Sequence, residues 1–179
     1  MKIIKTVLIV FSVLISMVLI VSLFLPSHYK VKRQIIINAT MEEVFSQVND
    51  FNKMQNWSPW RDYDPGMTIT VEGEIGKAGY KYSWNSSNKE VGSGSLTRVN
   101  TQNERMISNE LNFVDYQMKS LNVWTFEQMP EGVKVTWGNE GDIPFLGRIF
   151  FVMMDPDKMM GPDFEKGLER LKSYCEKND

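Results

Sequence analysis

Aromatic side chains carry most of the chemistry that this chain of 179 residues can offer. Trp57 and Trp60 flank Ser58-Pro59 in one predicted loop, and the other candidates lie in predicted strands and helices: Tyr80, Tyr82, Trp84, Trp124, Phe126, Trp137, Phe150 and Phe164. Tryptophan and tyrosine join a large apolar ring to one polar group, so they can line or rim a pocket and orient a ligand with a polar end. The core is the role that we favour for the loop tryptophans and the strand aromatics, because an aromatic ring buries a large area in either role.

Residues for acid–base or metal chemistry are scarce. The only histidine is His28 and the only cysteine is Cys175, which excludes a Cys/His zinc site and a histidine-based triad in the domain. No spacing pairs the carboxylates that could transfer a proton, namely Asp62, Asp64, Glu72, Glu74 and Glu110. We expect no metal, no cofactor and no catalytic residue, and a binding protein rather than an enzyme.

The N-terminal region predicts a membrane anchor. Val7–Leu25 holds nineteen residues without a charge, and a helix of that length spans about 28 Å at roughly 1.5 Å per residue, close to a hydrocarbon core of about 30 Å. A cleaved signal peptide is the first alternative, but Phe24-Leu25-Pro26-Ser27 has no small-x-small site. A buried core helix is the second, but the run is apolar all round. A single-pass protein of the cell membrane is therefore predicted, with the lipid bilayer as a partner.

The side of the membrane follows less directly from the sequence. Lysines and arginines are balanced across the apolar run, so the positive-inside rule does not decide. A six-residue tail ahead of a first helix usually stays in the cytosol, so we expect the domain on the extracytoplasmic side.

Size and charge restrict the rest of the chain. Residues 1–30 are predicted to be the anchor and its link, and residues 31–179 one domain, a usual domain length. The net charge is −2 and the pI about 5.6, which argues against a nucleic-acid partner. The sequence does not identify a protein partner.

Residue periodicity predicts an α+β domain. A strand over Val31–Asn38 precedes a short helix over 41–50, where Thr40 and Glu43 have capping-box spacing. Period-two alternation then predicts about six antiparallel strands, over 67–72, 80–84, 90–99, 105–113, 118–128 and 133–137. Gly92 and Gly94 suggest a bulge or a close approach of the last helix.

The C-terminal region predicts a long amphipathic helix over 156–177. Asp155 before Pro156 has the sequence of a capped start, and Cys175 falls on the apolar stripe. A twisted sheet curls, and one helix rarely fills its concave side, so we expect a cavity between them. The apolar segment Ile143–Met154 could pack over the sheet end or form a flexible, Met-rich gate at the bilayer.

The order of these motifs resembles a known family. The matching segments are 31–39, 43–45, 48–51, Trp57-Ser58-Pro59-Trp60 with Asp64-Pro65, Gly79-Tyr80 ahead of Trp84, 91–94, Val135-Thr136-Trp137, and 161–168. Over roughly residues 31–177 the chain resembles the START-like, Bet v 1-type helix-grip superfamily, also labelled polyketide cyclase/dehydrase-like or SRPBCC, and among it the bacterial membrane-anchored members. The resemblance implies a curved antiparallel sheet around a C-terminal helix, with a hydrophobic ligand pocket between them. It implies no single chemistry.

Membrane-anchored binding of a hydrophobic or amphipathic small molecule, with lipid among the candidates, is the function we expect. The ten aromatic residues named at the outset are its candidate pocket lining or rim. A cyclase- or hydratase-type enzyme and a partner-binding regulatory module whose pocket is filled by its own side chains are the alternatives.

Overall fold

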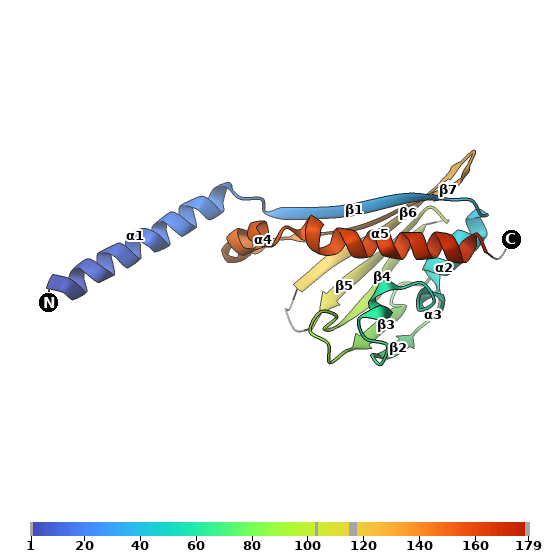
Figure 1. The fold of residues 1–179 in the computed structure, drawn as a ribbon, viewed down its shortest axis with the longest axis horizontal. Helices are drawn as coiled ribbons and strands as arrows, with labels where there is room; N and C mark the ends of the chain where they lie inside the picture. Colours follow the sequence, from blue (N-terminus) through green and yellow to red (C-terminus); the bar gives the residue numbers. More distant parts are fainter. Residues whose placement is uncertain (1, 103, 115–117, 178–179) are drawn as a thin grey trace.

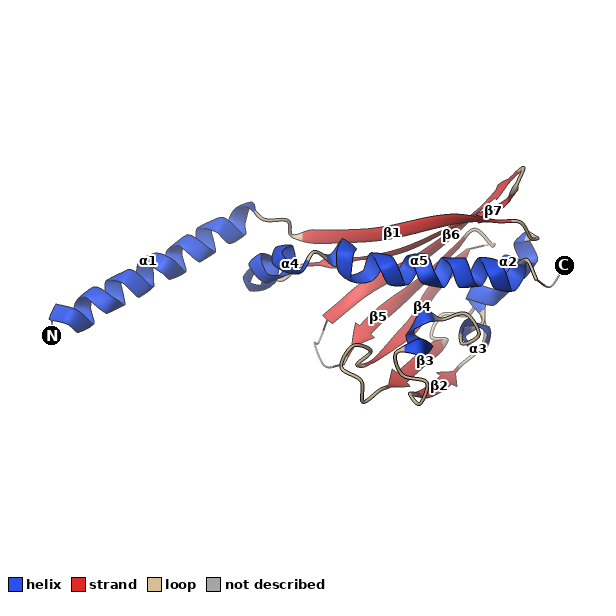
Figure 2. Ribbon diagram, viewed as in Figure 1, coloured by secondary structure: helices blue, strands red, loops and turns tan. Residues whose placement is uncertain are grey.

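The computed structural model describes residues 2–102, 104–114 and 118–177 (Figure 1). It shows an apolar helix that projects from one end of a single sheet, and a long C-terminal helix that lies across one face of that sheet (Figures 1 and 2). The elements follow in the order α1 (Lys2–Phe24), β1 (His28–Ile37), α2 (Met41–Asn49), α3 (Phe51–Met54), η1 (Pro59–Asp62), β2 (Thr68–Glu72), β3 (Lys81–Asn85), β4 (Ser93–Gln102), β5 (Met106–Phe113), β6 (Met118–Met129), β7 (Gly132–Asp142), η2 (Phe145–Gly147), α4 (Arg148–Met154) and α5 (Pro156–Cys175). The predicted α+β helix-grip fold is confirmed.

The seven strands form one antiparallel sheet in the order β1-β7-β6-β5-β4-β3-β2. Strands β2 to β7 lie in sequence order, and the last strand, β7, pairs with the first, β1, at the edge of the sheet. Side chains alternate between the two faces, and the face that packs on α5 is called the inner face here. It carries the alternating residues in register with Val135 and Trp137 of β7, such as Arg33 and Ile35 of β1 and Trp124 and Phe126 of β6.

The core lies between the inner face, α2 and α5. Leu168, Leu171 and Cys175 of α5 are buried against a sheet whose Val133 and Val135 are fully inaccessible. The helical spacing of the α5 residues and the period-two spacing of β7 bring two apolar surfaces together, which is the main favourable term in folding such a domain. The prediction that Cys175 is a core residue is confirmed.

Three local predictions differ from the structure. Strand β1 begins at His28 instead of Val31, because β7 extends to Asp142 and pairs with it there. Gly94 makes room for the Trp84 ring, since an added Cβ would lie 2.6 Å from Trp84 Cζ2, and the last helix is not involved. The bulge in β4 lies between Arg98 and Asn100, beyond both glycines.

Helix caps were predicted with mixed success. Thr40 Oγ1 accepts from the Glu43 backbone N–H at 3.2 Å, as the capping-box spacing predicts. Asp155, in contrast, makes no capping hydrogen bond to α5. Its backbone adopts φ 49°, and its carboxylate pairs with Lys158 at 3.0 Å. An N-cap residue normally has an extended backbone, whereas the sharp turn between α4 and α5 holds Asp155 in a left-handed conformation.

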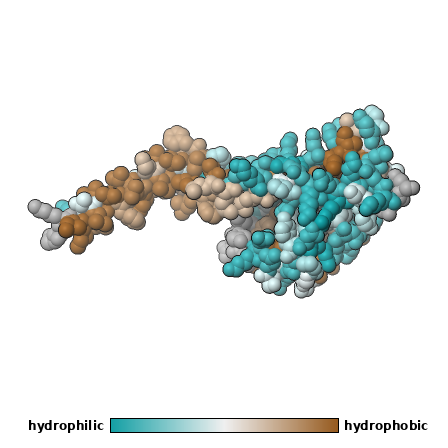
Figure 3. Space-filling view, in the orientation of Figure 1, coloured by the Kyte–Doolittle hydropathy of each residue, from teal (hydrophilic) through white to brown (hydrophobic). Residues whose placement is uncertain are grey.

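Helix α1 stands apart from the domain. Its span Ile3–Phe24 is long and apolar enough to cross a membrane, and almost none of it is buried by the protein. Figure 3 shows hydrophobic atoms along this helix, in contrast to the mostly hydrophilic domain surface.

Candidate ligand-binding site

Stacked aromatic rings occupy the centre of the space between sheet and helix. Trp137 of β7 stacks on Trp124 of β6 and on Phe164 of α5, with ring centroids 4.4 Å apart in both pairs. All three side chains are buried. Stacking at this distance leaves no room for a ligand between the rings. We call Trp124, Trp137 and Phe164 the aromatic stack.

The predicted loop motif folds onto this stack. Trp57 makes edge contacts with Trp124 and Trp137, and its indole N–H donates to the backbone oxygen of Gln47 at 3.3 Å. Trp60 makes an edge contact with Trp137 at 5.5 Å and is half-buried. Trp57 is thus a core residue by its contacts, and Trp60 lies at the margin of the core.

Tyr80, which directly precedes β3, and Tyr82 and Trp84 of β3 form a second group with Phe51. Tyr80 stacks on Phe51 at 4.7 Å, and Tyr82 lies between Phe51 and Trp84. Burial raises the pKa of Tyr82 to about 12, and burial together with the neighbouring Asp50 carboxylate raises the pKa of Tyr80. Both hydroxyls therefore stay protonated at neutral pH. Phe126, the remaining strand aromatic, is buried against Phe45 at 5.3 Å.

The expected cavity between sheet and α5 is not found at the centre of the grip, where the described rings of the aromatic stack are in contact. Phenyl and indole rings in mutual contact fill the middle of the inner face.

The inner face is only half-covered at one end. Apolar side chains of the inner face are partly exposed there. They are Trp84, Leu96, Leu111 and Phe113 of the sheet, and Met160 of α5 lies opposite them. We call these five residues the open end.

The open end lies toward α1. Leu111 is paired with Ser120, which adjoins Gly141, and Gly141 is paired with Tyr29 near the start of β1. Figure 1 shows the end of β5 on the same side of the domain as α4 and α1. An opening at this place would therefore face the membrane end of the molecule.

A row of buried polar residues crosses the inner face beside the open end. Arg98, Asn109, Asn122 and Asn139 occupy directly paired positions on β4, β5, β6 and β7, and each is at most 5 % exposed. We call these four residues the polar row. Buried polar groups normally need hydrogen-bond partners. The two ends of the polar row differ in how many of their polar atoms have one.

The Arg98 end of the polar row is well bonded. Its guanidinium donates to Asn109 Oδ1 at 2.8 Å, to Thr101 Oγ1 at 2.9 Å and to the backbone oxygen of Asn49 at 3.2 Å. Burial lowers the pKa of Arg98 to about 10. These bonds connect the end of α2 to β4 and β5, so Arg98 has a structural explanation.

The Asn139 end of the polar row is poorly bonded. Asn139 Nδ2 approaches only the Met160 sulfur, at 3.7 Å, and Asn139 Oδ1 has no donor among the described residues. The Trp137 indole N–H, two residues away on the same strand, is buried and likewise has no acceptor there. Trp57 Nε1, Trp84 Nε1 and Trp124 Nε1 all have acceptors. One donor and one acceptor are therefore left for a molecule with a polar group.

Phe150 lies outside this region. It is on α4, is 64 % exposed and is not part of the core cluster. The segment Ile143–Met154 does form a short helix, α4, which contacts α1 and α5 and packs on the edge of the sheet through Phe151 and Tyr29 of β1. Of the ten aromatic candidates, nine therefore lie on or beside the inner face and one lies at the α1 end.

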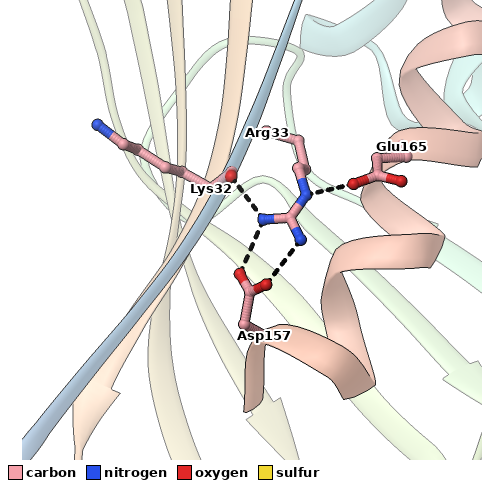
Figure 4. A network of polar contacts seen from close by, with 4 residues as sticks. All are labelled: Lys32, Arg33, Asp157 and Glu165. Atoms are coloured by element: carbon pink, nitrogen blue, oxygen red, sulfur yellow. Dashed lines mark hydrogen bonds and ion pairs between the residues drawn. The ribbon is translucent and has the colours of Figure 1, made fainter. Parts of the chain in front are cut away.

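Ion pairs hold α5 over the inner face. Arg33 of β1 donates two hydrogen bonds to the Asp157 carboxylate, at 2.8 and 2.9 Å, and one to Glu165 at 2.6 Å (Figure 4). Gly161 lies under the guanidinium, where an added Cβ would be 2.1 Å from Arg33 Nη2. Hydrogen bonds to Asp157 and then Glu165 raise the pKa of Arg33, so this clamp stays charged.

The predicted carboxylates are engaged in ordinary surface contacts. Asp62 pairs with Lys166 and Arg170 of α5, and Glu110 pairs with Lys119. Asp64 accepts hydrogen bonds from Ser86 and from the Gly66 backbone. No group of histidine, cysteine or carboxylate residues that could hold a metal ion occurs among the described residues.

Sequence reasoning missed the polar row, although a signal for it existed. Asn139 is in phase with Trp137, Asn122 with Trp124, and Asn109 with Ile107. Three asparagines at core parity on three consecutive strands indicate a buried polar row, because residues two apart share a face.

Comparison with known proteins agrees with this architecture. The sequence model of the family described as "Polyketide cyclase / dehydrase and lipid transport" matches residues 28–176. The match begins where β1 begins. The comparison with curated proteins gave no match.

Solved structures share the fold at low identity. A protein from Mesorhizobium loti has a TM-score of 0.62 at 12 % identity, over 84 % of this chain and 99 % of its own. The Aha1 dimer from Colwellia psychrerythraea has a TM-score of 0.54 at 13 % identity, over 82 % and 93 %. The di-domain ARO/CYC protein StfQ of the steffimycin biosynthetic pathway has a TM-score of 0.60 at 10 % identity, over 85 % of this chain and 52 % of its own.

Hydrophobic ligand binding is the coarse function that the family description suggests. With a sequence match over nearly all of the domain and a helix-grip fold, the chain belongs to the polyketide cyclase/dehydrase and lipid transport family, within the START-like, Bet v 1-type superfamily.

Proposed function

We propose that this protein binds a hydrophobic or amphipathic small molecule at the open end, while α1 holds the domain at a membrane. The observation that supports it best is the unpartnered pair of Trp137 Nε1 and Asn139 Oδ1 on β7, both buried, with the Met160 sulfur of the open end 3.7 Å from Asn139 Nδ2. Leaving such groups unbonded costs about 1–3 kcal/mol each. A ligand with one acceptor and one donor would satisfy both groups, and its apolar part would cover Leu96 and Leu111.

The bound molecule would occupy the margin of the aromatic stack and not its centre. Met160 is the most adaptable neighbour at that margin, because its side chain is flexible and fits irregular apolar partners. Among the ten aromatic candidates, Trp84, Trp137 and Trp60 are the ones that we assign to the ligand's surroundings.

Membrane anchoring by α1 completes the proposal. Side chains along α1 are largely exposed, including Val7 at 61 %, Leu14 at 55 % and Phe24 at 85 %. Such a surface is stable only when lipid or another apolar partner covers it. The link to the domain is short, so the open end stays near the bilayer and its effective concentration toward membrane amphiphiles is high. We place the domain on the extracytoplasmic side.

Photocrosslinking tests the proposed site. Full-length protein is reconstituted in bilayer nanodiscs that contain either a phospholipid or a fatty acid with a diazirine on its acyl chain, and the modified peptides are identified by mass spectrometry. We expect adducts from at least one probe on β4 and β5, near Leu96 and Leu111. Adducts confined to α1 and residues 143–154 with both probes would refute ligand binding at the open end.

A matched pair of variants controls for the site. Leu111→Trp places a larger ring in the open end, whereas Leu121→Trp makes the same change on the outer face of β6, where Leu121 is also half-buried. We expect the first variant to lose the β4–β5 adducts and the second to keep them. Equal labelling of both variants would contradict the assignment.

A partner-binding module remains a second candidate, because the centre of the grip is filled by the protein's own rings. The same crosslinking experiment separates the two functions. A domain that takes up neither probe at the open end would favour the partner module.

A further inference from the structure

An exposed apolar face lies next to the end of α1. Leu146 and Met153 are each 80 % exposed, and Phe150 is 64 % exposed. Their spacing of four and three residues puts them on one side of the η2–α4 segment. Val152 and Met154 of α4 and Met159 of α5 are also exposed, whereas exposed apolar residues of the sheet and its loops, such as Ile75 and Val99, are scattered singly. Single exposed apolar residues are normal for a soluble surface, and a contiguous patch is not.

The opposite side of the same segment is fixed to the protein. Phe151 packs on Tyr29 of β1 with ring centroids 5.2 Å apart. Arg148 Nη1 donates to the backbone oxygen of Ser22 in α1 at 3.1 Å, and its guanidinium lies 5.3 Å from the centre of the Phe145 ring. The exposed face is therefore held in place beside α1, and is not a loose end.

These contacts set the depth of the exposed face. The span Ile3–Phe24 has 22 residues and is about 33 Å long at roughly 1.5 Å per residue, close to a hydrocarbon core of about 30 Å. Ser22 therefore lies near the boundary between hydrocarbon and headgroups. Arg148, the only charged residue between Ile143 and Met154, reaches that level.

The surface colouring agrees with this depth. Figure 3 shows hydrophobic atoms continuing from α1 toward the domain, where the hydrophilic surface then begins. An arginine at the boundary with apolar neighbours on one side matches the pattern of an interfacial segment.

We propose that Leu146, Phe150 and Met153 insert into the leaflet that holds the C-terminal end of α1, with lipid acyl chains as their partner. This inference rests on the proposed anchoring by α1 and extends it: the domain then has two membrane contacts, and the open end faces the leaflet. The ligand class that follows is a membrane amphiphile that enters from the bilayer, and not a solute from the aqueous phase.

Depth-dependent quenching tests the insertion. Single cysteines replace Leu146, Phe150 or Met153 in the full-length protein, and Val99→Cys is the control, since Val99 is 51 % exposed on the sheet. Cys175 is fully buried and can stay, because a thiol without solvent access reacts poorly. Each protein is labelled with an environment-sensitive fluorophore and reconstituted in vesicles of phosphatidylethanolamine and phosphatidylglycerol, with or without nitroxide-labelled phospholipid.

We expect blue-shifted emission and loss of most fluorescence to the nitroxide lipid for labels at 146, 150 and 153, and neither effect at 99. Labels at all three positions that behave like the label at 99 would overturn the insertion. This readout does not depend on a bound ligand. Insertion can therefore be observed when crosslinking at the open end fails, and crosslinking can be observed when insertion fails.

Discussion

At the scale of single residues, the two ends of the polar row behave differently. Arg98 bonds to three neighbours, whereas Asn139 has only a methionine sulfur within reach. A residue whose polar group is buried without a good partner lowers stability. Such a residue is a better candidate for binding than one that is fully bonded, and Asn139 is therefore the most informative position in the site.

Substitution of Asn139 by leucine should separate binding from stability. Leucine has a similar shape and removes the unpartnered oxygen, so we expect the free energy of unfolding to stay within about 1 kcal/mol or to increase. Affinity for the crosslinking lipid should fall about 5–10-fold, the value of one lost hydrogen bond. Urea unfolding and probe titration measure the two quantities.

Asn122→Leu is the control for that variant. Asn122 Oδ1 accepts from Asn109 at 3.2 Å and from Trp124 at 3.0 Å, so its loss leaves two buried donors unbonded. We expect a loss of about 2–4 kcal/mol in the free energy of unfolding. A larger loss for Asn139→Leu than for Asn122→Leu would show that Asn139 is a structural residue.

At the scale of elements, the close packing of α5 on the sheet depends on a glycine of that helix. Gly167 lies against the aromatic stack: an added Cβ would be 2.7 Å from Trp137 Cζ3 and 3.3 Å from Pro59 Cδ. The Trp137 ring is itself held between Trp124 and Phe164, so it cannot move aside.

Gly167→Ala should therefore destabilise the domain although alanine favours helices. Overpacking typically costs about 1–3 kcal/mol, and the gain in helix propensity of up to about 1 kcal/mol offsets only part of it. Gly147→Ala is the matched control, because nothing lies within 4 Å of its added Cβ. Thermal unfolding of both variants should show a lower Tm for the first alone, and unchanged Tm values in both would contradict the close fit.

Acid should loosen the same helix. Hydrogen bonds from Arg170, then Lys166, lower the pKa of Asp62 to about 2, from an ordinary 3.8, and Arg33 lowers the pKa of Asp157. A lowered folded-state pKa stabilises the fold above the unfolded value, and the contribution disappears as pH falls through the folded value. We expect the free energy of unfolding to fall between about pH 4 and pH 2.

The Asp62→Asn variant identifies the source of that pH dependence. Urea unfolding at several pH values should show a shallower decrease for the variant than for the unchanged protein, because one of the two titrating carboxylates is gone. Parallel curves would assign the effect to other carboxylates.

How much the sequence could predict also depends on the element. Period-two alternation located the six strands of 68–142 and helical spacing located α5, because each of these elements has one buried face. The start of β1 at His28 was missed because residues 26–30 were assigned to the link after the anchor, although Tyr29 alternates with Val31 and tyrosine favours strands. The filled centre was only an alternative to the expected cavity, because alternation tells which face Trp124 and Trp137 share, but not that their rings stack with Phe164.

At the scale of the whole molecule, the arrangement places every proposed membrane contact at one end. Helix α1, the exposed face of α4 and the open end lie on the same side of the domain, and the C-terminus of α5 lies at the other (Figure 1). The C-terminal end is therefore free to carry a reporter without disturbing the proposed site.

A topology reporter at the C-terminus tests the orientation of the molecule. We expect alkaline phosphatase fused there to be active in intact bacteria and a fluorescent protein that folds only in the cytosol to stay dark, because the short N-terminal tail remains inside. The opposite pair of results would place the domain in the cytosol, and the proposed ligand would then come from the inner leaflet surface.

The junction between α1 and β1 limits how the domain can move. Helix α1 ends at Phe24 and β1 begins at His28, so three residues join them, and Arg148 bridges the two parts. In the proposed membrane arrangement, a linker of three residues holds the domain at the bilayer surface, so the domain would exchange ligand only with molecules that diffuse laterally in that membrane.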